Sequence, residues 1–236
     1  MRQMVIVVLG LVGLVGAKDV GAAMVADTIL LPEPSFKGKV TVEEALKARR
    51  SIRDFQDEPL ELAQVAQLLW AAYGVTKPLP GRELRGGLRT APSAGALYPL
   101  EIYLVAGKVT GLGPGVFRYL SERHALVKLA EGDRRKELAA AAWGQDMIAR
   151  APAVIVYSAV FERNTRKYGQ RGRERFVCMD LGHSAENVYL QAVALGLGTC
   201  AVGAFEDSSV KRVIGMTKPE EPLYLMPVGR PRRTEF

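Results

Sequence analysis

The chain has 236 residues, of which 48% are hydrophobic and 24% are charged, and its formal net charge is +7. This composition is typical of a globular protein long enough to bury a sizeable core, and it excludes a disordered chain. The positive charge suits an anionic partner, but the arginines form separate clusters at 49–53, 163–175 and 230–233 rather than one basic stripe with interleaved aromatic residues, which disfavours a nucleic-acid binder.

The N-terminal segment, "MRQMVIVVLGLVGLVGAKDVGAAMVA", opens with one arginine and continues as an uncharged apolar run to Ala17. That run is shorter than the roughly 20 residues of a spanning helix, and small residues resembling cleavage sites follow it. We expect residues 1–26 to be a signal peptide or an N-terminal anchor, with a buried or interface helix as the alternative, and residues 27–236 to form the folded domain. A signal peptide implies a periplasmic or other extracytoplasmic protein, and otherwise the protein is cytoplasmic. Membrane contact is expected only through an uncleaved anchor.

The elements of the body alternate between helices and strands. The capping box Thr41-Val42-Glu43-Glu44 predicts a helix to about Arg49, and apolar spacing predicts a second helix over 60–74, followed by a loop over 75–96. Strands are predicted over 101–107, 115–120, 124–130, 153–160, 199–205 and 222–231. Further helices are predicted over 134–145, 173–198 and, capped by Asp207 or Ser208, up to Gly215. The fold class is therefore α+β, with a mixed central sheet flanked by helices.

Cysteine and histidine are scarce, with only Cys178, Cys200, His124 and His183. They are too few and too scattered for a typical metal site, so no metal is expected. We expect buried free thiols, with a disulfide as an open alternative that export would favour.

The first candidate site is "RRSIRDF", which follows the first helix. Arg49, Arg50, Ser51 and Arg53 offer guanidinium donors and a hydroxyl, which is the donor set that a phosphate requires. A solvated basic patch at the end of a helix is the alternative.

The second and third candidates expose backbone rather than side chains. In "RTAPSAGALYPLEIYLV" the stretch Pro92-Ser93-Ala94-Gly95 has no bulky side chain, so a flat ligand could lie along it, although a structural turn has the same composition. In "GLGTCAVGAFED", Gly203 and Ala204 lie where a strand ends and a helix begins, so their N–H groups could face an electron-rich acceptor. Neither a dinucleotide-binding glycine motif nor a P-loop is present.

Taken together and in order, five segments resemble the nitroreductase family of FMN flavoproteins, and most closely its SagB-type dehydrogenase (azoline oxidase-like) branch. These segments are "ARRSIRDF", "RTAPSAGALYPLEIYLV", "RKYGQRGRERFVCMDLGHSAENVYLQAVALGLG", "VGAF" and "LMPVGRP". The resemblance covers roughly residues 41–231. It implies the nitroreductase-like fold as an intertwined homodimer, with FMN at the interface.

The resemblance also implies a set of FMN contacts. The basic segment, residues 49–53, would bind the phosphate and the ribityl chain together with Arg230 and Arg232. The small-residue loop, residues 92–95, would come from the partner subunit and lie along the isoalloxazine. The VGAF segment would present N–H groups near N5 and O4 of the flavin. The residues so implied are Arg49, Arg50, Ser51, Arg53, Pro92, Ser93, Ala94, Gly95, Gly203, Ala204, Arg230 and Arg232.

In azoline-oxidising members of the branch, a Lys-Tyr pair before the long helix is linked to proton removal from the substrate. Lys167 and Tyr168 occupy that place and are the implied catalytic residues. A surface lysine beside a packing tyrosine is the alternative. The segment continues "RGRER" where related sequences have "RGYR", a difference that bears on substrate contacts.

The implied function is that of an FMN-dependent oxidoreductase with hydride transfer at flavin N5, acting on a small organic substrate such as an azoline. An NAD(P)H-dependent nitro or quinone reductase is the first alternative. A non-redox flavin-binding or flavin-processing protein is the alternative from another class. Export would separate the protein from cytosolic NAD(P)H.

Overall fold

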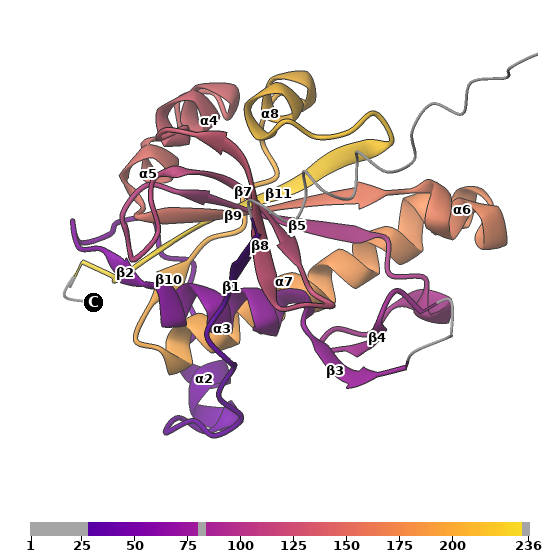
Figure 1. Ribbon diagram of the computed structural model, residues 1–236, viewed down its shortest axis with the longest axis horizontal. Helices are drawn as coiled ribbons and strands as arrows, with labels where there is room; N and C mark the ends of the chain where they lie inside the picture. The colour runs from indigo at the N-terminus through magenta and orange to yellow at the C-terminus, as the bar shows by residue number, and fades with distance from the viewer. Residues whose placement is uncertain (1–27, 80–83, 233–236) are drawn as a thin grey trace, which may run out of the picture.

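The computed structural model describes residues 28–79 and 84–232 (Figure 1). The predicted signal peptide or anchor, residues 1–26, lies outside the described residues. No helix in the described ranges has the length and apolar character needed to cross a membrane.

A seven-stranded sheet forms the centre of the molecule (Figure 1). In spatial order its strands are β1 (Thr28–Leu30), β8 (Ala125–Glu131), β7 (Gly115–Leu120), β5 (Leu100–Ala106), β9 (Ala153–Val160), β11 (Glu220–Gly229) and β10 (Gly198–Thr199). Neighbouring strands of this sheet pair antiparallel. Parallel pairing occurs outside it, between β2 (Leu60–Glu61) and β6 (Val109–Thr110).

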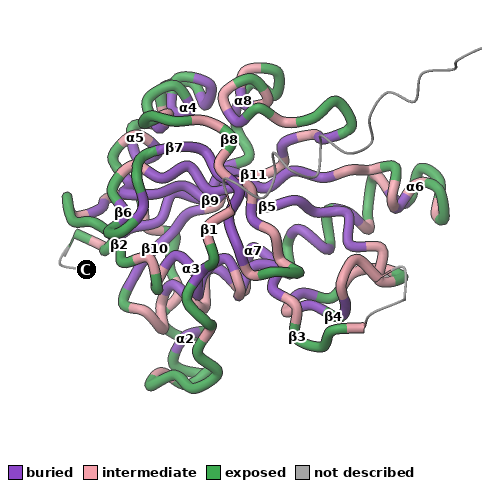
Figure 2. Tube along the Cα trace, viewed as in Figure 1, coloured by how far each residue is buried: buried purple, intermediate pink, exposed green. Residues whose placement is uncertain are grey.

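Helices cover both faces of the sheet (Figure 1). One face packs against α3 (Leu62–Tyr73) and α7 (Val177–Ala194), and the other against α4 (Arg135–Ala141), α5 (Asp146–Arg150) and α8 (Asp207–Ile214). Every residue of β5 and all but the last residue of β9 are buried, as expected for strands covered on both sides (Figure 2). The α+β fold flanked by helices is confirmed, but the central sheet is antiparallel rather than mixed as predicted.

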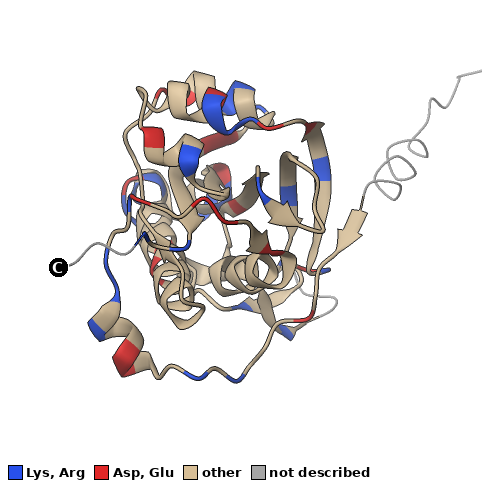
Figure 3. Cartoon of the chain, turned by 90° about the vertical axis from the view of Figure 1, so that its left-hand side faces the viewer, with Lys and Arg blue, Asp and Glu red and all other residues tan. Residues whose placement is uncertain are grey.

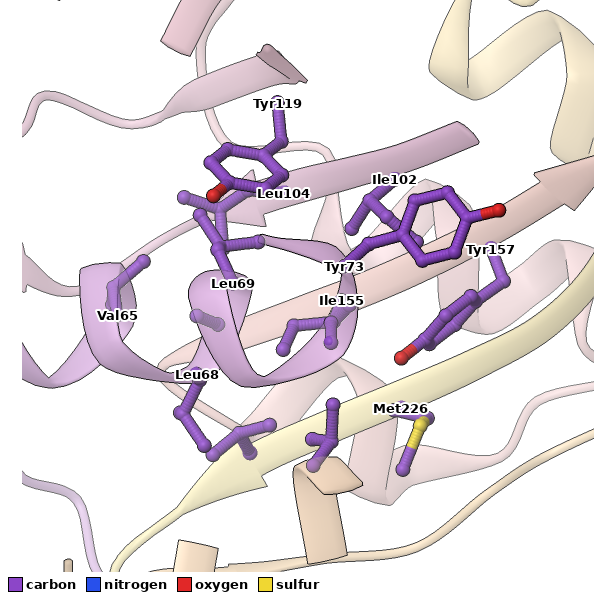
Figure 4. Packing of buried hydrophobic residues seen from close by; sticks show 14 of the residues in the cluster. Val65, Leu68, Leu69, Tyr73, Ile102, Leu104, Tyr119, Ile155, Tyr157 and Met226 are labelled. Carbon is purple, nitrogen blue, oxygen red and sulfur yellow. The ribbon is translucent and has the colours of Figure 1, made fainter. Parts of the chain in front are cut away.

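The strand side chains alternate between two cores, since successive residues of a strand point to opposite faces. Ile102 and Leu104 of β5 join Ile155 and Tyr157 of β9 beneath α3 and α7, together with Met226 (Figure 4). Their neighbours along the same two strands face the second core, beneath α4, α5 and α8: Tyr103, Val105, Val154 and Val156.

The capped first helix is confirmed as α2 (Val42–Ala48), with both hydrogen bonds of the capping box at Thr41 and Glu44 present. The segment 75–96, predicted as a loop, instead contains an antiparallel hairpin of β3 (Val75–Pro78) and β4 (Gly87–Arg89), followed by a 3-10 turn, η1 (Ala94–Ala96). These strands are too short to produce a periodic pattern, so local sequence could not reveal them.

The helix predicted over 173–198 is divided into a π-helix, η2 (Gly172–Phe176), and α7. The short helix α6 (Glu162–Tyr168) precedes them and was not predicted. The helix predicted over 134–145 corresponds to α4, which ends at Ala141, and α5 lies beyond the predicted range and was not predicted. A π-turn continues an apolar stripe with only a small phase shift, so the spacing of apolar residues does not mark the boundary.

The strand predicted over 199–205 pairs with β11 only at 198–199, after which a single bridge joins Val202 to Leu225. The N-cap of α8 is Glu206 rather than Asp207 or Ser208. Its carboxylate accepts the N–H groups of Ser208 at 3.1 Å and Ser209 at 2.6 Å, and hydrogen bonds from Ser209 and Ser208 lower the pKa of Glu206 to about 2.

Candidate functional site

The basic segment, residues 49–53, leaves α2 and runs along the edge of the sheet beside β10. Ser51 forms a parallel bridge with Thr199, and the Ile52 N–H donates to the Thr199 carbonyl at 2.9 Å. A cavity of about 230 Å³ opens here, lined by Arg50 and Thr199 among others. In Figure 3 the chain leaving α2 carries basic residues on this side of the molecule. The segment is therefore held by main-chain bonds beside an open space.

Few carboxylates lie close enough to neutralise the arginines of the basic segment. Arg50 and Arg53 donate only to backbone carbonyls of residues 47–51, and neither has an ion-pair partner among the described residues. Arg49 lies 3.8 Å from Glu186 and 5.3 Å from the centroid of the Tyr189 ring. Most of the positive charge thus remains available to an anion.

The end of the described chain lies against the same segment. The Gln56 N–H donates to the Arg230 carbonyl at 2.8 Å, and the Arg232 N–H donates to the Asp54 carbonyl at 3.1 Å. The side chain of Arg230 pairs with Glu58 at 3.0 Å, and that of Arg232 lies 3.7 Å from Asp54. The structure thus brings Arg230 and Arg232 next to the basic segment, each with a carboxylate partner.

Two further groups at this place were missed from sequence. The Tyr189 hydroxyl accepts the Ala201 N–H at 2.7 Å and lies 3.3 Å from the Ser51 hydroxyl, so it joins the basic segment to the chain that leads to Gly203. The hydroxyl of Thr199 is buried and has no hydrogen-bond partner among the described residues. The position of Tyr189 beside the apolar stripe of the long helix was a signal that could have identified it. The sequence around Thr199 gave no such signal.

The small-residue loop, Pro92–Gly95, is anchored by a buried carboxylate on α7. The Ser93 hydroxyl donates to Asp180 at 2.6 Å and accepts the Tyr98 N–H at 2.9 Å, while the Ala94 N–H donates to Asp180 at 3.2 Å. Burial raises the pKa of Asp180, against the effect of these hydrogen bonds. Asp180 was not predicted, although a charge within the apolar stripe of a helix was a usable signal.

The backbone of this loop is strained just beyond Gly95. Ala96 and Tyr98 have φ values of 53° and 47°, a left-handed conformation that costs a residue with a side chain roughly 1–2 kcal/mol. Such conformations persist only where surrounding contacts enforce them, and they gather at functional sites. The hydrogen bonds from Ser93 and Ala94 to Asp180 are among the contacts that hold the strained backbone of this loop.

Lys167 and Tyr168 meet the loop directly. A Cβ atom built on Gly95 would lie 2.5 Å from the Tyr168 hydroxyl and 3.1 Å from Lys167 Nζ. Lys167 is exposed, and its Nζ lies 5.3 Å from the centroid of the Tyr168 ring. The structure therefore joins the second candidate segment to the predicted Lys-Tyr pair, about 70 residues apart in sequence, and Gly95 is the residue that allows the contact.

A buried carboxylate with three arginines fixes the elements behind this contact. The side chain of Glu101, at the start of β5, is 6% exposed and lies 2.7 Å from Arg85, 2.9 Å from Arg118 and 2.6 Å from Arg163. Arg85 and Arg163 also donate to the Tyr98 carbonyl, at 2.7 and 3.3 Å. Since Arg163 belongs to α6, this cluster ties the helix that carries Lys167 to the loop.

Gly203 and Ala204 are exposed, and neither N–H has a hydrogen-bond partner in the described part of the chain. The Ala204 carbonyl accepts from the Gln145 amide at 2.9 Å. A Cβ on Gly203 would lie 3.5 Å from the Tyr224 ring, an ordinary van der Waals contact. The two N–H groups are available to an acceptor, as the sequence suggested.

The family model of the nitroreductase family matches residues 46–230. The chain belongs to the nitroreductase family. A nitroreductase homologue of Methanocaldococcus jannaschii is 45% identical over 204 residues, covering 86% of this chain and 98% of its own. The predicted family is confirmed, and with it an oxidoreductase of a family that generally uses flavin and acts on small molecules.

Two other relatives extend the comparison. A solved nitroreductase-type structure from Ralstonia eutropha has a TM-score of 0.72 and 31% identity, covering 88% of this chain and 91% of its own. The microcin B17-processing protein McbC of Escherichia coli is 27% identical over 162 residues, covering 66% of this chain and 57% of its own length.

In this nitroreductase-family chain the candidate residues form two groups linked by α7. Asp180 holds the small-residue loop near the start of the helix, and Tyr189 contacts the basic segment further along, roughly 13 Å away at about 1.5 Å per residue. β10 and α6 lie on opposite sides of the view in Figure 1. Within the described residues no hydrogen bond, ion pair or ring contact joins the Lys-Tyr pair to the basic segment.

The cysteines take no part in either group. Cys178 is exposed and Cys200 is buried, and both are free thiols. The prediction of a buried thiol is wrong for Cys178, which lies on the outer face of α7. Among residues 28–79 and 84–232, no three His, Cys, Asp or Glu side chains gather as metal ligands would.

Proposed function

We propose that this protein is an FMN-dependent oxidoreductase that works as a homodimer and transfers a hydride between the flavin and a small organic molecule. The observation that carries the proposal is the division of the site on one chain. One group offers cations and hydroxyls, and the other offers a bare loop in contact with Lys167 and Tyr168. A second copy that supplies the loop to the first copy's basic segment would complete the site.

The basic segment fits a phosphate. Among residues 28–79 and 84–232, Arg50 and Arg53 have no carboxylate partner and the Thr199 hydroxyl, buried next to the cavity, has no hydrogen-bond partner. Charge-assisted donors plus a neutral hydroxyl match the oxygens of a phosphate monoester. Arg49, Ser51, Arg230 and Arg232 would complete this end of the FMN site.

We expect Tyr189→Phe to raise the Kd for FMN about tenfold, because it removes a hydrogen bond that positions Ser51 and leaves the Ala201 N–H without its acceptor. Quenching of FMN fluorescence during titration of the apoprotein measures this Kd. Tyr119→Phe is the matched control, since the Tyr119 hydroxyl bonds to His124 instead. An unchanged Kd for Tyr189→Phe would remove this residue from the site.

The ring end of the site would be built from main chain. The free N–H groups of Gly203 and Ala204 would donate to the electron-rich edge of the isoalloxazine, and the Pro92–Gly95 loop of the partner subunit would cover it without side-chain bulk. The flavin, when bound, supplies the hydride chemistry. The protein supplies position and a face open to substrate.

Lys167 and Tyr168 would handle the proton. Lys167 Nζ lies beside the Gly95 backbone, so it can hold a proton taken from a substrate carbon over the loop, with the Tyr168 hydroxyl orienting the substrate. The similarity to McbC favours dehydrogenation of an azoline-like substrate. An NAD(P)H-dependent nitro or quinone reductase uses the same groups and is the second candidate, favoured by the homologue from Methanocaldococcus jannaschii.

An absorbance spectrum of the purified protein, followed by anaerobic titration with NADH and NADPH, tests these readings. We expect the two visible bands of an oxidised flavin and a dimer by light scattering. Bleaching by either nucleotide would select the reductase over the dehydrogenase. A flavin that no reductant bleaches would select a non-redox flavin-binding protein. A colourless monomer that takes up no FMN would refute the proposal.

A further inference from the structure

The arm formed by α6, η2 and the turn between them, residues 162–176, has more positive charge than nearby carboxylates neutralise. Three of its arginines are paired: Arg163 with Glu101, Arg166 with Glu162 and Arg173 with Glu221. Lys167, Arg171 and Arg175 are exposed and have no ion-pair partner among the described residues. The remaining carboxylate of the arm, Glu174, accepts from the Gln170 amide at 3.1 Å. Among the described residues, three of the arm's six cations thus form ion pairs and the other three form none.

Two of the unpaired cations flank a pair of aromatic rings. Tyr168 and Phe176 meet edge to face, with ring centroids 4.8 Å apart. Lys167 Nζ lies 5.3 Å from the Tyr168 centroid, and the guanidinium carbon of Arg171 lies 6.0 Å from that of Phe176. Ring contacts of this kind orient a cation and leave its charge uncompensated.

This aromatic–cationic surface, made of Lys167, Tyr168, Arg171 and Phe176, reaches the small-residue loop through Tyr168, whose hydroxyl lies against Gly95. A ligand on the loop would therefore meet ammonium and guanidinium groups together with the edge or face of a ring. Donors of both kinds bind carboxylates, and the planar guanidinium does so in two parallel bonds.

We propose that this surface selects a planar organic anion, a carboxylate carried on an azoline-like or nitroaromatic ring, as the substrate of the oxidoreductase site. The carboxylate would pair with Arg171 while its ring packs on Tyr168 and Phe176, which leaves Lys167 to take the proton. The inference rests on the proposed function, because the flavin-loaded site is where such a substrate would react.

The test compares two unreactive probes of equal shape, benzoate and benzamide, by calorimetric titration of the flavin-loaded protein, in which FMN occupies the basic segment. We expect benzoate to bind about tenfold tighter than benzamide, the difference made by one hydrogen bond to a charged group. Raising the NaCl concentration should weaken benzoate binding and leave benzamide binding unchanged.

Arg171→Gln should abolish the preference for benzoate, whereas Arg166→Gln should preserve it. Both variants lose one positive charge from the same arm, but Arg166 is 76% exposed and already paired with Glu162. Equal binding of the two probes, or equal effects of the two variants, would show an ordinary solvated basic surface and overturn the inference alone. Failure to take up flavin would overturn the proposed function, and this inference with it.

Discussion

Replacing Glu101 with glutamine should lower the free energy of unfolding by about 3 kcal/mol. The carboxylate is 6% exposed and within 3 Å of Arg85, Arg118 and Arg163. Glutamine keeps the volume but leaves three guanidiniums close together without their counter-charge. Because these arginines are 25–32% exposed, water relieves part of the repulsion, which places the loss at the low end of the range for breaking a buried ion pair.

Denaturant unfolding followed by circular dichroism at neutral pH measures this loss. Glu131→Gln is the matched control, since Glu131 is 84% exposed and in the described part of the chain pairs only with Lys128, and we expect it to change the free energy by less than about 1 kcal/mol. Similar losses in the two variants would mean that Glu101 does not organise the loop and α6.

Replacing Gly95 with alanine should lower kcat/KM about 100-fold, the scale expected when reacting groups are displaced by roughly an ångström. The new methyl group would lie 2.5 Å from the Tyr168 hydroxyl and 3.1 Å from Lys167 Nζ, so the Lys-Tyr pair would have to move away from the loop. Steady-state kinetics with the substrate or electron donor found by the flavin titration give the value.

Gly111→Ala is the control that distinguishes the steric clash with Tyr168 and Lys167 from the effect of backbone strain. Gly95 and Gly111 have similar positive φ values, 65° and 79°, but no atom of the described residues lies within 4 Å of a Cβ at Gly111. Both substitutions should destabilise the fold by roughly 1–2 kcal/mol because alanine is disfavoured in that conformation. Only Gly95→Ala should slow turnover. Equal rates in the two variants would remove the contact between the loop and the Lys-Tyr pair from the mechanism.

Local signals in the sequence were sufficient for several parts of this protein. The capping box at Thr41, the apolar spacing of 60–74 and the continuous apolar run of 153–160 each predicted an element that the structure contains. The ordered motifs predicted the family, which the family model confirms over residues 46–230. Such features depend on neighbouring residues, so they can be read without knowing what the segment packs against.

The site residues that the sequence did not reveal act through contacts with residues far away in the chain. Asp180 bonds to residues 86 and 87 positions earlier, and Tyr189 reaches Ser51 across 138 positions. Glu101 collects arginines from the hairpin, from β7 and from α6. The apolar stripe of the long helix could indicate that Asp180 and Tyr189 are buried, but no local pattern identifies their partners, because only chain folding brings those partners near.

The sequence by itself determined the α+β class, most of the strands, the family and the residue types of the proposed phosphate-and-ring site. Only the tertiary structure decided that the bare loop meets Lys167 and Tyr168, that Asp180 and Glu101 hold it there, and that the basic segment lies elsewhere on the same chain. Hydrophobic periodicity specifies which face of an element is buried. Contacts between distant polar groups depend instead on strand order and helix placement, which that periodicity does not encode.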